Sequence, residues 1–355
     1  MCYVYAMNLD DLLSQMCPWL RGDGEENDIV ISCRIRLARN LVGFPFPIRT
    51  TEQDRRLVQE TVRQAAATLF PENDYIFAET PTLSPLEKAC LWERQLISRE
   101  LAESELTHAA LIDRQEHFCV MMNDEDHLRI HAKGSGLVPQ KVWEQVNRID
   151  DQLADKLDYV FHKKYGFLTS RATNAGTGMK ISMILHLPGL VATNEMDKVA
   201  RSLLKKNLTV CGFYGEGSQI HGDLFQISNR ITLGKSEDEL IAKMLDLIPQ
   251  IVEFERQARH FLIKNRREII FDRCSRALGV LQTARTISQV ETMRHLSSLR
   301  LGIHTGLLKG PDIATVNLLL LHTQTAHMQK IQGTPLSQAD QDIHRANYIR
   351  QKIGN

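Results

Sequence analysis

The sequence has no excess of charge of either sign. Its 355 residues include 43 lysines and arginines and 43 aspartates and glutamates, so its formal net charge at neutral pH is zero. A chain with balanced charge has no overall attraction for nucleic acid or for an anionic membrane, and any phosphate site in it must be a local cluster of cations. We therefore expect neither nucleic acid nor a membrane as a partner.

Long hydrophobic runs and paired cysteines are also absent. No apolar run reaches the roughly 18 residues that cross a bilayer, and Met1 to Asp10 lack the basic flank and apolar segment of a signal peptide. The seven cysteines are scattered, odd in number and include no CxxC pair, which argues against a disulfide framework and against a zinc site. We expect a cytoplasmic protein with reduced thiols and no metal site.

The hydrophobic periodicity predicts a mixed α+β fold followed by a helical region. Period-two alternation predicts strands, at residues 29–37, 117–122, 128–132, 179–187, 208–214 and 224–233. Spacings of three and four predict helices, at residues 52–69, 85–103, 139–158, 195–205 and 236–264. Because the strands come in hairpins and not in strict alternation with helices, the sheet should be largely antiparallel. Beyond residue 265 only helical periodicity is present.

Two arginines share one face of the first predicted strand. In Ser32-Cys-Arg-Ile-Arg36 the guanidinium groups of Arg34 and Arg36 lie on the same side, about 7 Å apart, and this spacing suits the oxygens of a polyphosphate. A solvated strand face is the alternative interpretation.

Three loops carry further candidate chemistry. Residues 123–129, Asn-Asp-Glu-Asp-His-Leu-Arg, form a dense carboxylate turn followed by an arginine, which suits a general base beside a phosphate contact. Residues 173–178 and 212–217 are glycine-containing loops, but neither matches the GxxxxGK[ST] phosphate loop. Taken singly, each of the three is better explained as an ordinary turn.

In chain order these motifs resemble the catalytic domain of the phosphagen (guanidino) kinases. The resemblance rests on Ser32-x-Arg-x-Arg36, residues 123–129, Thr173-Asn-x-Gly-Thr177 and Gly215-Glu216. Further motifs look like those of the bacterial protein-arginine kinases, namely Phe167-Leu-Thr169, Leu185-His-Leu-Pro188, Tyr214-Gly-Glu-Gly217, Phe225-Gln-Ile-Ser-Asn229, Ile231-Thr-Leu-Gly-Lys-Ser236 and Leu299-Arg-Leu-Gly302. Together they cover roughly residues 28–350.

The resemblance implies a phosphagen-kinase-like catalytic domain at residues 28–260, an α+β domain whose largely antiparallel sheet is flanked by helices. It also implies an N-terminal extension at residues 1–27 and an all-α C-terminal domain at residues 261–355, for dimerisation and phosphoarginine recognition. We expect no room before residue 28 for the small N-terminal domain of the phosphagen kinases, which disfavours a kinase for small guanidino compounds.

The activity that the resemblance implies is transfer of the γ-phosphoryl group of ATP, with Mg²⁺ carried by the nucleotide, to arginine side chains of proteins. Glu125 matches the catalytic base of the family, and Glu216 matches the second carboxylate that holds the guanidinium. The expected substrate pocket also contains Arg171 and Asn174. Nucleotide contacts are expected from Ser32, Arg34, Arg36, Gln95, Arg129, Lys180, Ser182, Cys211, Gly212, Tyr214 and Gly215.

Four of these positions depart from the family pattern. Arg171 stands where the family has a cysteine, and Gln95 where it has a histidine. Lys180 and Cys211 replace phosphate-binding arginines, so a bidentate contact is lost at one and the charge itself at the other. A guanidinium beside two carboxylates should pair with them, so we hypothesise that Arg171 occupies the substrate pocket as a built-in mimic. The alternative function is a weak or inactive pseudokinase that acts as an adaptor through its helical domain.

The C-terminal element and the partners are expected from the resemblance alone. Gln341-Asp-Ile-His-Arg-Ala346 resembles the RDxxRA element that binds phosphoarginine; Asp342, Arg345 and Ala346 are retained, and Gln341 replaces the first arginine. An ordinary helix turn with a charge pair is the alternative. The expected partners are protein substrates with exposed arginine, a small zinc-binding activator, a Clp-type protease and a second copy of this chain in a homodimer.

Overall fold

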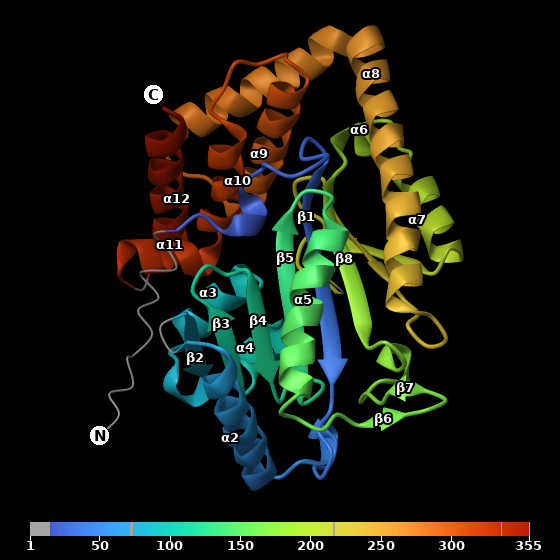
Figure 1. Cartoon of the computed structure of the whole chain (residues 1–355). Coiled ribbons are helices and arrows are strands. Elements are labelled where there is room, and N and C mark those ends of the chain that lie inside the picture. The colour runs from blue at the N-terminus through green and yellow to red at the C-terminus, as the bar shows by residue number, and fades with distance from the viewer. Residues whose placement is uncertain (1–14, 72–73, 216, 335, 355) are drawn as a thin grey trace.

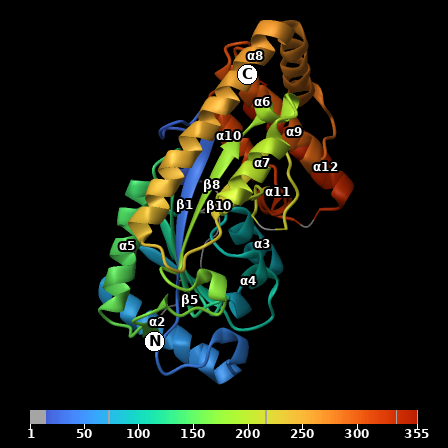
Figure 2. The ribbon, with the colours of Figure 1, turned by 90° about the vertical axis from the view of Figure 1, so that its right-hand side faces the viewer.

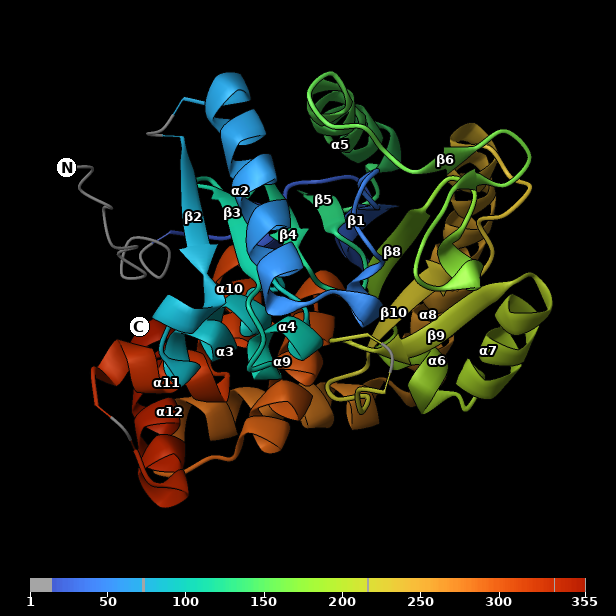
Figure 3. The same ribbon diagram turned by 90° about the horizontal axis from the view of Figure 1, so that it is seen from below.

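The computed structural model describes residues 15–71, 74–215, 217–334 and 336–354. Within them lies one eight-stranded sheet in which every neighbouring pair of strands is antiparallel. Figure 3 shows the strands in sheet order, which is β2 (Tyr75–Glu79), β3 (Ala109–Asp113), β4 (Phe118–Met122), β5 (Leu128–Ser135), β1 (Val30–Arg39), β8 (Met179–His186), β10 (Leu224–Asn229) and β9 (Leu208–Gly212). A separate hairpin joins β6 (Phe161–His162) to β7 (Gly166–Phe167).

Helices pack on both faces of the sheet, as the edge-on view in Figure 2 shows. The first face carries the largest apolar core, formed with α2 (Glu52–Leu69), α5 (Pro139–Ala154), α6 (Pro188–Ala192), α7 (Met196–Lys205) and the first half of α8 (Glu237–Thr283). On the second face, α3 (Pro85–Glu93) and α4 (Arg99–Glu103) cover β2, β3 and β4.

The two faces of β1 have opposite characters. Cys33, Ile35 and Leu37 enter the core of the first face, where α5 lies across β5 and β1 (Figure 1). Arg34 and Arg36 alternate with them and point to the second face, as the two-residue period of a strand requires. The central strand of the sheet therefore carries core residues on one side and cations on the other.

The helical region lies at one end of the sheet (Figure 1) and contains the second half of α8 with α9 (Gln289–His304), α10 (Ile313–His322), α11 (Thr325–Gln332) and α12 (Gln338–Ile353). Helix α8 bends at Arg266, whose φ of −141° and ψ of 32° are not helical. Residues before β1 join this region to the sheet: Arg300 donates to the carbonyl of Asp28 at 2.9 Å, and Asn317 donates to the carbonyl of Leu20 at 3.0 Å. Among the described residues, no helix combines the length and apolar character that crossing a bilayer requires.

The predicted α+β class and antiparallel sheet are confirmed, but three details are wrong. Strands β2 and β3 were not predicted; β3 lacks alternation, because Ala109 and Leu111 enter one apolar core and Ala110 and Ile112 enter another. The helix expected at 85–103 is two helices, because Gln95 between them has left-handed backbone with φ 58°. The strand expected at 224–233 ends at Asn229. The domain boundary near residue 260 stays a prediction, since α8 continues through it.

Candidate active site

A row of polar and cationic side chains crosses the second face of the sheet. Pairing between β5, β1 and β8 brings Arg36 directly opposite both His131 and Lys180. Arg34 is opposite Lys133 in the same way. We call this set the cationic row; it consists of Arg129, His131, Lys133, Arg34, Arg36, Lys180 and Ser182.

Arg34 and Arg36 are the two central guanidinium groups of the cationic row. Within the described residues, neither Arg34 nor Arg36 forms an ion pair or a side-chain hydrogen bond. Burial, and then repulsion by Arg129, lowers the pKa of Arg34 to about 10. Burial, followed by repulsion from Arg129 and Arg34, lowers the pKa of Arg36 well below its usual value. Two guanidinium groups held close together without an ion pair among the described residues favour a polyanion such as the phosphates of a nucleotide.

The carboxylate turn between β4 and β5 is anchored at its first residue. Asn123 has left-handed backbone with φ 58°, which asparagine adopts more readily than most residues. Its side-chain amide donates to the carbonyl of Arg55 at 2.8 Å, and Arg55 donates to the carbonyl of Asn123 at 3.1 Å. Asp124 then pairs with Arg129 and accepts a hydrogen bond from Ser98 Oγ at 3.1 Å. The turn is thus tied to α2 on one side and to the cationic row on the other.

Asp126 fastens a distant loop to this turn. Its Oδ1 accepts a hydrogen bond from Asn40 Nδ2 at 2.7 Å and another from the backbone N–H of Ser170 at 2.6 Å. Asp126 is fully buried, so these charge-assisted bonds are shielded from water. The loop that contains Arg171 is thereby held beside Glu125.

Glu125 contacts two residues of that loop. Arg171 Nε forms an ion pair with Glu125 Oε1, and Asn174 Nδ2 donates to Glu125 Oε2 at 3.4 Å. The Arg171 side chain is 68% exposed, so solvent weakens the pair. A guanidinium therefore lies on the predicted base, which is the contact that a built-in mimic requires.

Close packing shapes the glycine-containing loop that presents Asn174. A Cβ at Gly176, whose φ is 101°, would lie 2.9 Å from the backbone of Leu233, so only glycine fits there. Thr232 Oγ1 donates to the carbonyl of Ala175 at 2.6 Å and holds the loop against the segment after β10. The glycines therefore serve the placement of Asn174.

Three of the predicted nucleotide-binding residues lie in or beside the loop after β9, namely Gln95, Tyr214 and Gly215. Gln95 donates from Nε2 to the carbonyl of Phe213 at 3.5 Å. The ring of Tyr214 packs on that of Trp92, with centroids 4.9 Å apart. Gly215 has φ 96°, which a residue with a side chain adopts only with strain. This loop is thus connected to the segment that follows α3.

The remaining predicted residues are distributed as follows. Ser32 is buried on β1, and Ser182 accepts a hydrogen bond from Ser228 Oγ at 2.9 Å. Cys211 and Gly212 lie on β9, two strands beyond Lys180. Glu216, predicted as the second carboxylate, lies outside the described residues. The roles assigned to these residues stay predictions.

Comparison with known proteins identifies the family. Residues 57–258 match the family model of the ATP:guanido phosphotransferase C-terminal catalytic domain, and residues 267–355 match that of the protein-arginine kinase McsB C-terminal domain. The protein-arginine kinase of Pelotomaculum thermopropionicum is 41% identical over 340 residues, which are 95% of this chain and 96% of that protein. The Bacillus cereus protein-arginine kinase is 37% identical over 350 residues, 98% and 99% of the two chains. The chain belongs to the protein-arginine kinase family.

The resemblance stated from the sequence is therefore confirmed, and this protein-arginine kinase family member contains a phosphotransferase catalytic domain. Solved structures agree in fold. Lombricine kinase has a TM-score of 0.58 at 22% identity, covering 69% of this chain and 70% of that one. The duplicated taurocyamine kinase from Schistosoma mansoni has a TM-score of 0.60 at 21% identity, covering 69% of this chain and 35% of that one.

Three residues of the predicted phosphoarginine element of this family member, Gln341, Arg345 and Ala346, are buried. Arg345 is fully buried; its Nε donates to the carbonyl of Thr323 at 2.8 Å, and its Nη1 donates to the carbonyl of Ile287 at 2.9 Å and pairs with Asp342. Gln341 donates to the carbonyl of Leu336 at 3.1 Å, and Ala346 is buried in the helical core. In this structure the element ties α12 to the segments before α9 and α11, and its phosphoarginine role stays a prediction.

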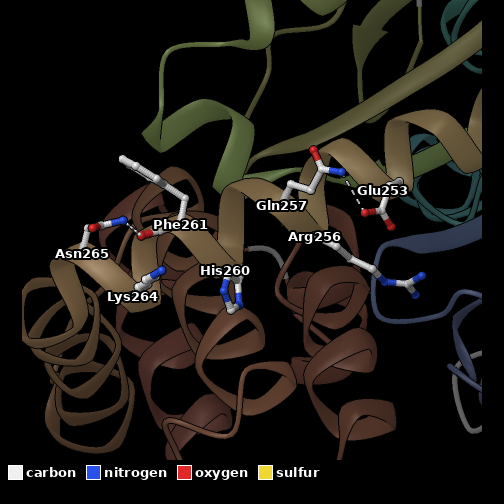
Figure 4. A pocket seen from close by; sticks show the side chains of 7 residues that line it. All are labelled: Glu253, Arg256, Gln257, His260, Phe261, Lys264 and Asn265. Atoms are coloured by element: carbon white, nitrogen blue, oxygen red, sulfur yellow. Dashed lines mark hydrogen bonds between the residues drawn. The ribbon is translucent and has the colours of Figure 1, made fainter.

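A surface hollow lies on α8, close to its bend (Figure 4). All the side chains that line it come from this one helix, and they are Glu253, Arg256, Gln257, His260, Phe261, Lys264 and Asn265. None of these seven belongs to the predicted site, and the cationic row contributes nothing to the hollow. The candidate active site is instead the cationic row together with the carboxylate turn that Asp124 joins to it, on the second face of the sheet.

Four residues of the site region, His131, Lys133, Asp126 and Asn40, were not among the predicted site residues. His131 and Lys133 alternate with Arg129 on β5, so the period of two would have identified them as members of the same face. Lys133 donates to the carbonyls of Arg94 and Gln95 at 2.8 and 3.1 Å, and burial lowers its pKa to about 8. The hydrogen bonds that join Asn40 and Ser170 to Asp126 have no local signal in the sequence, because Ser170 is distant from Asp126 in the chain.

Proposed function

We propose that this protein transfers the γ-phosphoryl group of ATP to arginine side chains of proteins. The observation that carries the proposal is the placement of Glu125: this carboxylate interacts electrostatically with Arg36 of the cationic row and already contacts a guanidinium, that of Arg171. The cationic row suits the phosphates of ATP, and Glu125 suits the guanidinium that would accept the phosphoryl group. The names of the relatives at 37–41% identity support the choice of a protein arginine as acceptor.

The chemistry follows from these two sides. Arg34, Arg36 and Arg129 would neutralise the charge that spreads over the phosphoryl group, and Mg²⁺ would arrive with the nucleotide. A guanidinium has a pKa of about 12.5 to 13.8, so it becomes a nucleophile only if a base takes its proton. In the proposed step a nitrogen of the substrate arginine forms a bond to Pγ, the bond from Pγ to the β,γ-bridging oxygen breaks, ADP leaves, and Glu125 receives the proton. Glu216 would align the guanidinium.

A pseudokinase that acts as an adaptor is the second candidate function. Cys211 brings no charge to a position where the family has a phosphate-binding arginine, and Arg171 occupies the carboxylate that a substrate arginine needs. Both features weaken a kinase. Lys180 nevertheless keeps a cation opposite Arg36, and Glu125 is retained, so we favour the kinase.

We extend the proposal to the setting of the reaction. The substrates are proteins with exposed arginine, marked in the cytoplasm for a Clp-type protease, with a small zinc-binding activator as a helper. The protein acts as a homodimer through residues 261–355. Each of these partners is proposed from family resemblance, and each is open to a binding measurement with the full-length chain.

Labelling separates the two functions. The full chain is incubated with γ-labelled ATP, Mg²⁺ and an arginine-rich unfolded protein, and label is sought in an acid-labile bond to arginine. We expect label with the wild type and a loss of about 100-fold or more with Glu125→Gln. Glu144→Gln, an exposed residue of α5, is the matched control and should keep full activity. Absence of label with the wild type, with the zinc-binding activator added, would favour the adaptor; equal label with Glu125→Gln would remove Glu125 as the base.

A further inference from the structure

His131 is a buried histidine of the cationic row. It is 1% exposed, and neither ring nitrogen has a partner among the described residues. His127, four residues earlier, is equally buried but satisfied: its Nδ1 accepts from the backbone N–H of Leu41 at 3.0 Å, and its Nε2 donates to the carbonyl of Pro45 at 2.9 Å. A buried polar group left without a partner destabilises a fold, so such a group calls for a functional explanation.

Cations surround His131 along β5 and on β1. Arg129 and Lys133 flank it on β5, and Arg36 is directly opposite on β1, with Arg34 next along that strand. On β4 the opposite residue is Cys119, whose thiol pKa is raised by burial, so it brings no negative charge. Burial, and then repulsion by Lys133, Arg34, Arg36 and Arg129, lowers the pKa of His131 well below its usual value. In the protein without a ligand, the imidazole is therefore neutral.

We propose that His131 is a further residue of the nucleotide site and that it takes up a proton from solvent when polyphosphate binds to the cationic row. The inference rests on the nucleotide site proposed above. Phosphates among Arg34, Arg36 and Arg129 cancel the repulsion that keeps the imidazole neutral. Once protonated, the ring has two N–H donors and one positive charge, which suit phosphate oxygens. His131 would thus supply at the cationic row the positive charge that Cys211 cannot.

Proton linkage determines the direction in which pH changes the nucleotide affinity. Nucleotide binding raises the pKa of His131, so the bound state holds more protons than the free state between the two pKa values. Nucleotide affinity therefore increases as the pH falls from 8 toward 6. Above the raised pKa, His131 is neutral in both states and contributes nothing to this dependence.

The test is calorimetric and uses the full chain. The β,γ-imido analogue of ATP, which is not hydrolysed at the bridge, is titrated with Mg²⁺ into the protein at pH 6.5 in buffers that differ in ionisation enthalpy. The dependence of the observed heat on buffer measures the number of protons taken up. His131→Gln keeps a polar side chain that does not titrate, and His127→Gln is the matched buried-histidine control. Protons exchanged by the nucleotide itself are common to all variants and cancel in the differences.

We expect the wild type and His127→Gln to take up the same number of protons, and His131→Gln to take up fewer by a difference of up to about one. We also expect His131→Gln to bind several-fold more weakly than the wild type at pH 6 and equally well at pH 8. His131→Asn serves as the second variant if the glutamine variant does not fold. Binding with equal proton numbers in wild type and variant overturns this inference alone, whereas no binding by the wild type overturns the nucleotide site together with it.

Discussion

Strand β1 holds three arginines in two opposite arrangements. Arg39, at its end, points to the first face; its guanidinium is held by Asp150 at 2.7 Å, by the carbonyls of Ala38 and Thr177 at 2.9 Å, and by the ring of Phe167, whose centroid is 3.6 Å away. Arg34 and Arg36, on the second face, form no ion pair among the described residues. The guanidinium of Arg39 is satisfied by partners within the protein and has a structural role. The guanidinium groups of Arg34 and Arg36, which have no such partners among the described residues, are available for a ligand.

The comparison predicts that loss of Arg39 has the largest effect on stability. Arg39→Met leaves Asp150 as an uncompensated buried carboxylate, so we expect the free energy of unfolding to fall by about 3 to 5 kcal/mol. Denaturant unfolding at neutral pH measures this change. Arg49→Met, on an exposed residue of the same charge, is the control and should change little. An unchanged unfolding midpoint for Arg39→Met would remove the distinction between the two faces of β1.

The same substitution at Arg36 should act in the opposite way. Arg36→Met removes a desolvated, repelled cation, so we expect an unchanged or higher free energy of unfolding. Nucleotide stabilisation should be lost: MgATP at 100 times its Kd adds about 2.7 kcal/mol to the wild type by mass action, and less or none to the variant. Thermal unfolding with and without MgATP measures both. If ATP still protects the variant fully, Arg36 does not hold the nucleotide.

A third arrangement sharpens the comparison. Arg300, in the helical region, is held by neutral acceptors such as the carbonyl of Asp28, and burial, and then repulsion by Arg259, lowers its pKa to about 9. Burial, and then repulsion by Arg300 and Arg259, lowers the pKa of the neighbouring His304 to about 3. Between pH 6.5 and 3 the unfolded chain binds a proton at this histidine that the folded chain does not, so stability falls as the pH falls.

The pH dependence of unfolding checks this third arrangement. We expect the denaturant midpoint to drop between pH 7 and pH 5, and His304→Gln to make that drop smaller. His260→Gln, on the exposed side of α8, should leave the drop as it is in the wild type. An equal drop in the His304 variant would assign the acid sensitivity to other groups.

The smallest predicted effect concerns Arg171. Its ion pair with Glu125 is largely exposed, and such pairs contribute about 0 to 1 kcal/mol, so releasing the carboxylate should raise phosphorylation of protein arginine by up to about fivefold. Arg171→Ala removes the competing guanidinium, and Arg171→Lys, which keeps a cation, should have less effect. Initial rates at low substrate concentration measure the change. A lower rate for Arg171→Ala would mean that Arg171 assists the transfer.

Local patterns in the sequence determined which residues share a face and which turns carry charge. The alternation in β1 separated Arg34 and Arg36 from Cys33, Ile35 and Leu37, because a strand has a period of two whatever its neighbours are. The order of the motifs determined the family. Neither pattern identified β2 and β3; both faces of β3 enter apolar cores, so its sequence does not alternate.

Only the tertiary structure decided which charge meets which. Arg34 and Arg39 look alike in the sequence, yet Asp150 lies 111 residues beyond Arg39 and compensates it alone. Asp126 and Glu125 are adjacent in the sequence. Asp126 accepts a hydrogen bond from Ser170, 44 residues away, whereas Glu125 contacts Arg171. Short-range steric rules assign the face of a side chain, whereas a counter-ion is assigned by long-range packing, and it is the counter-ion that separates a structural guanidinium from one left free for a substrate.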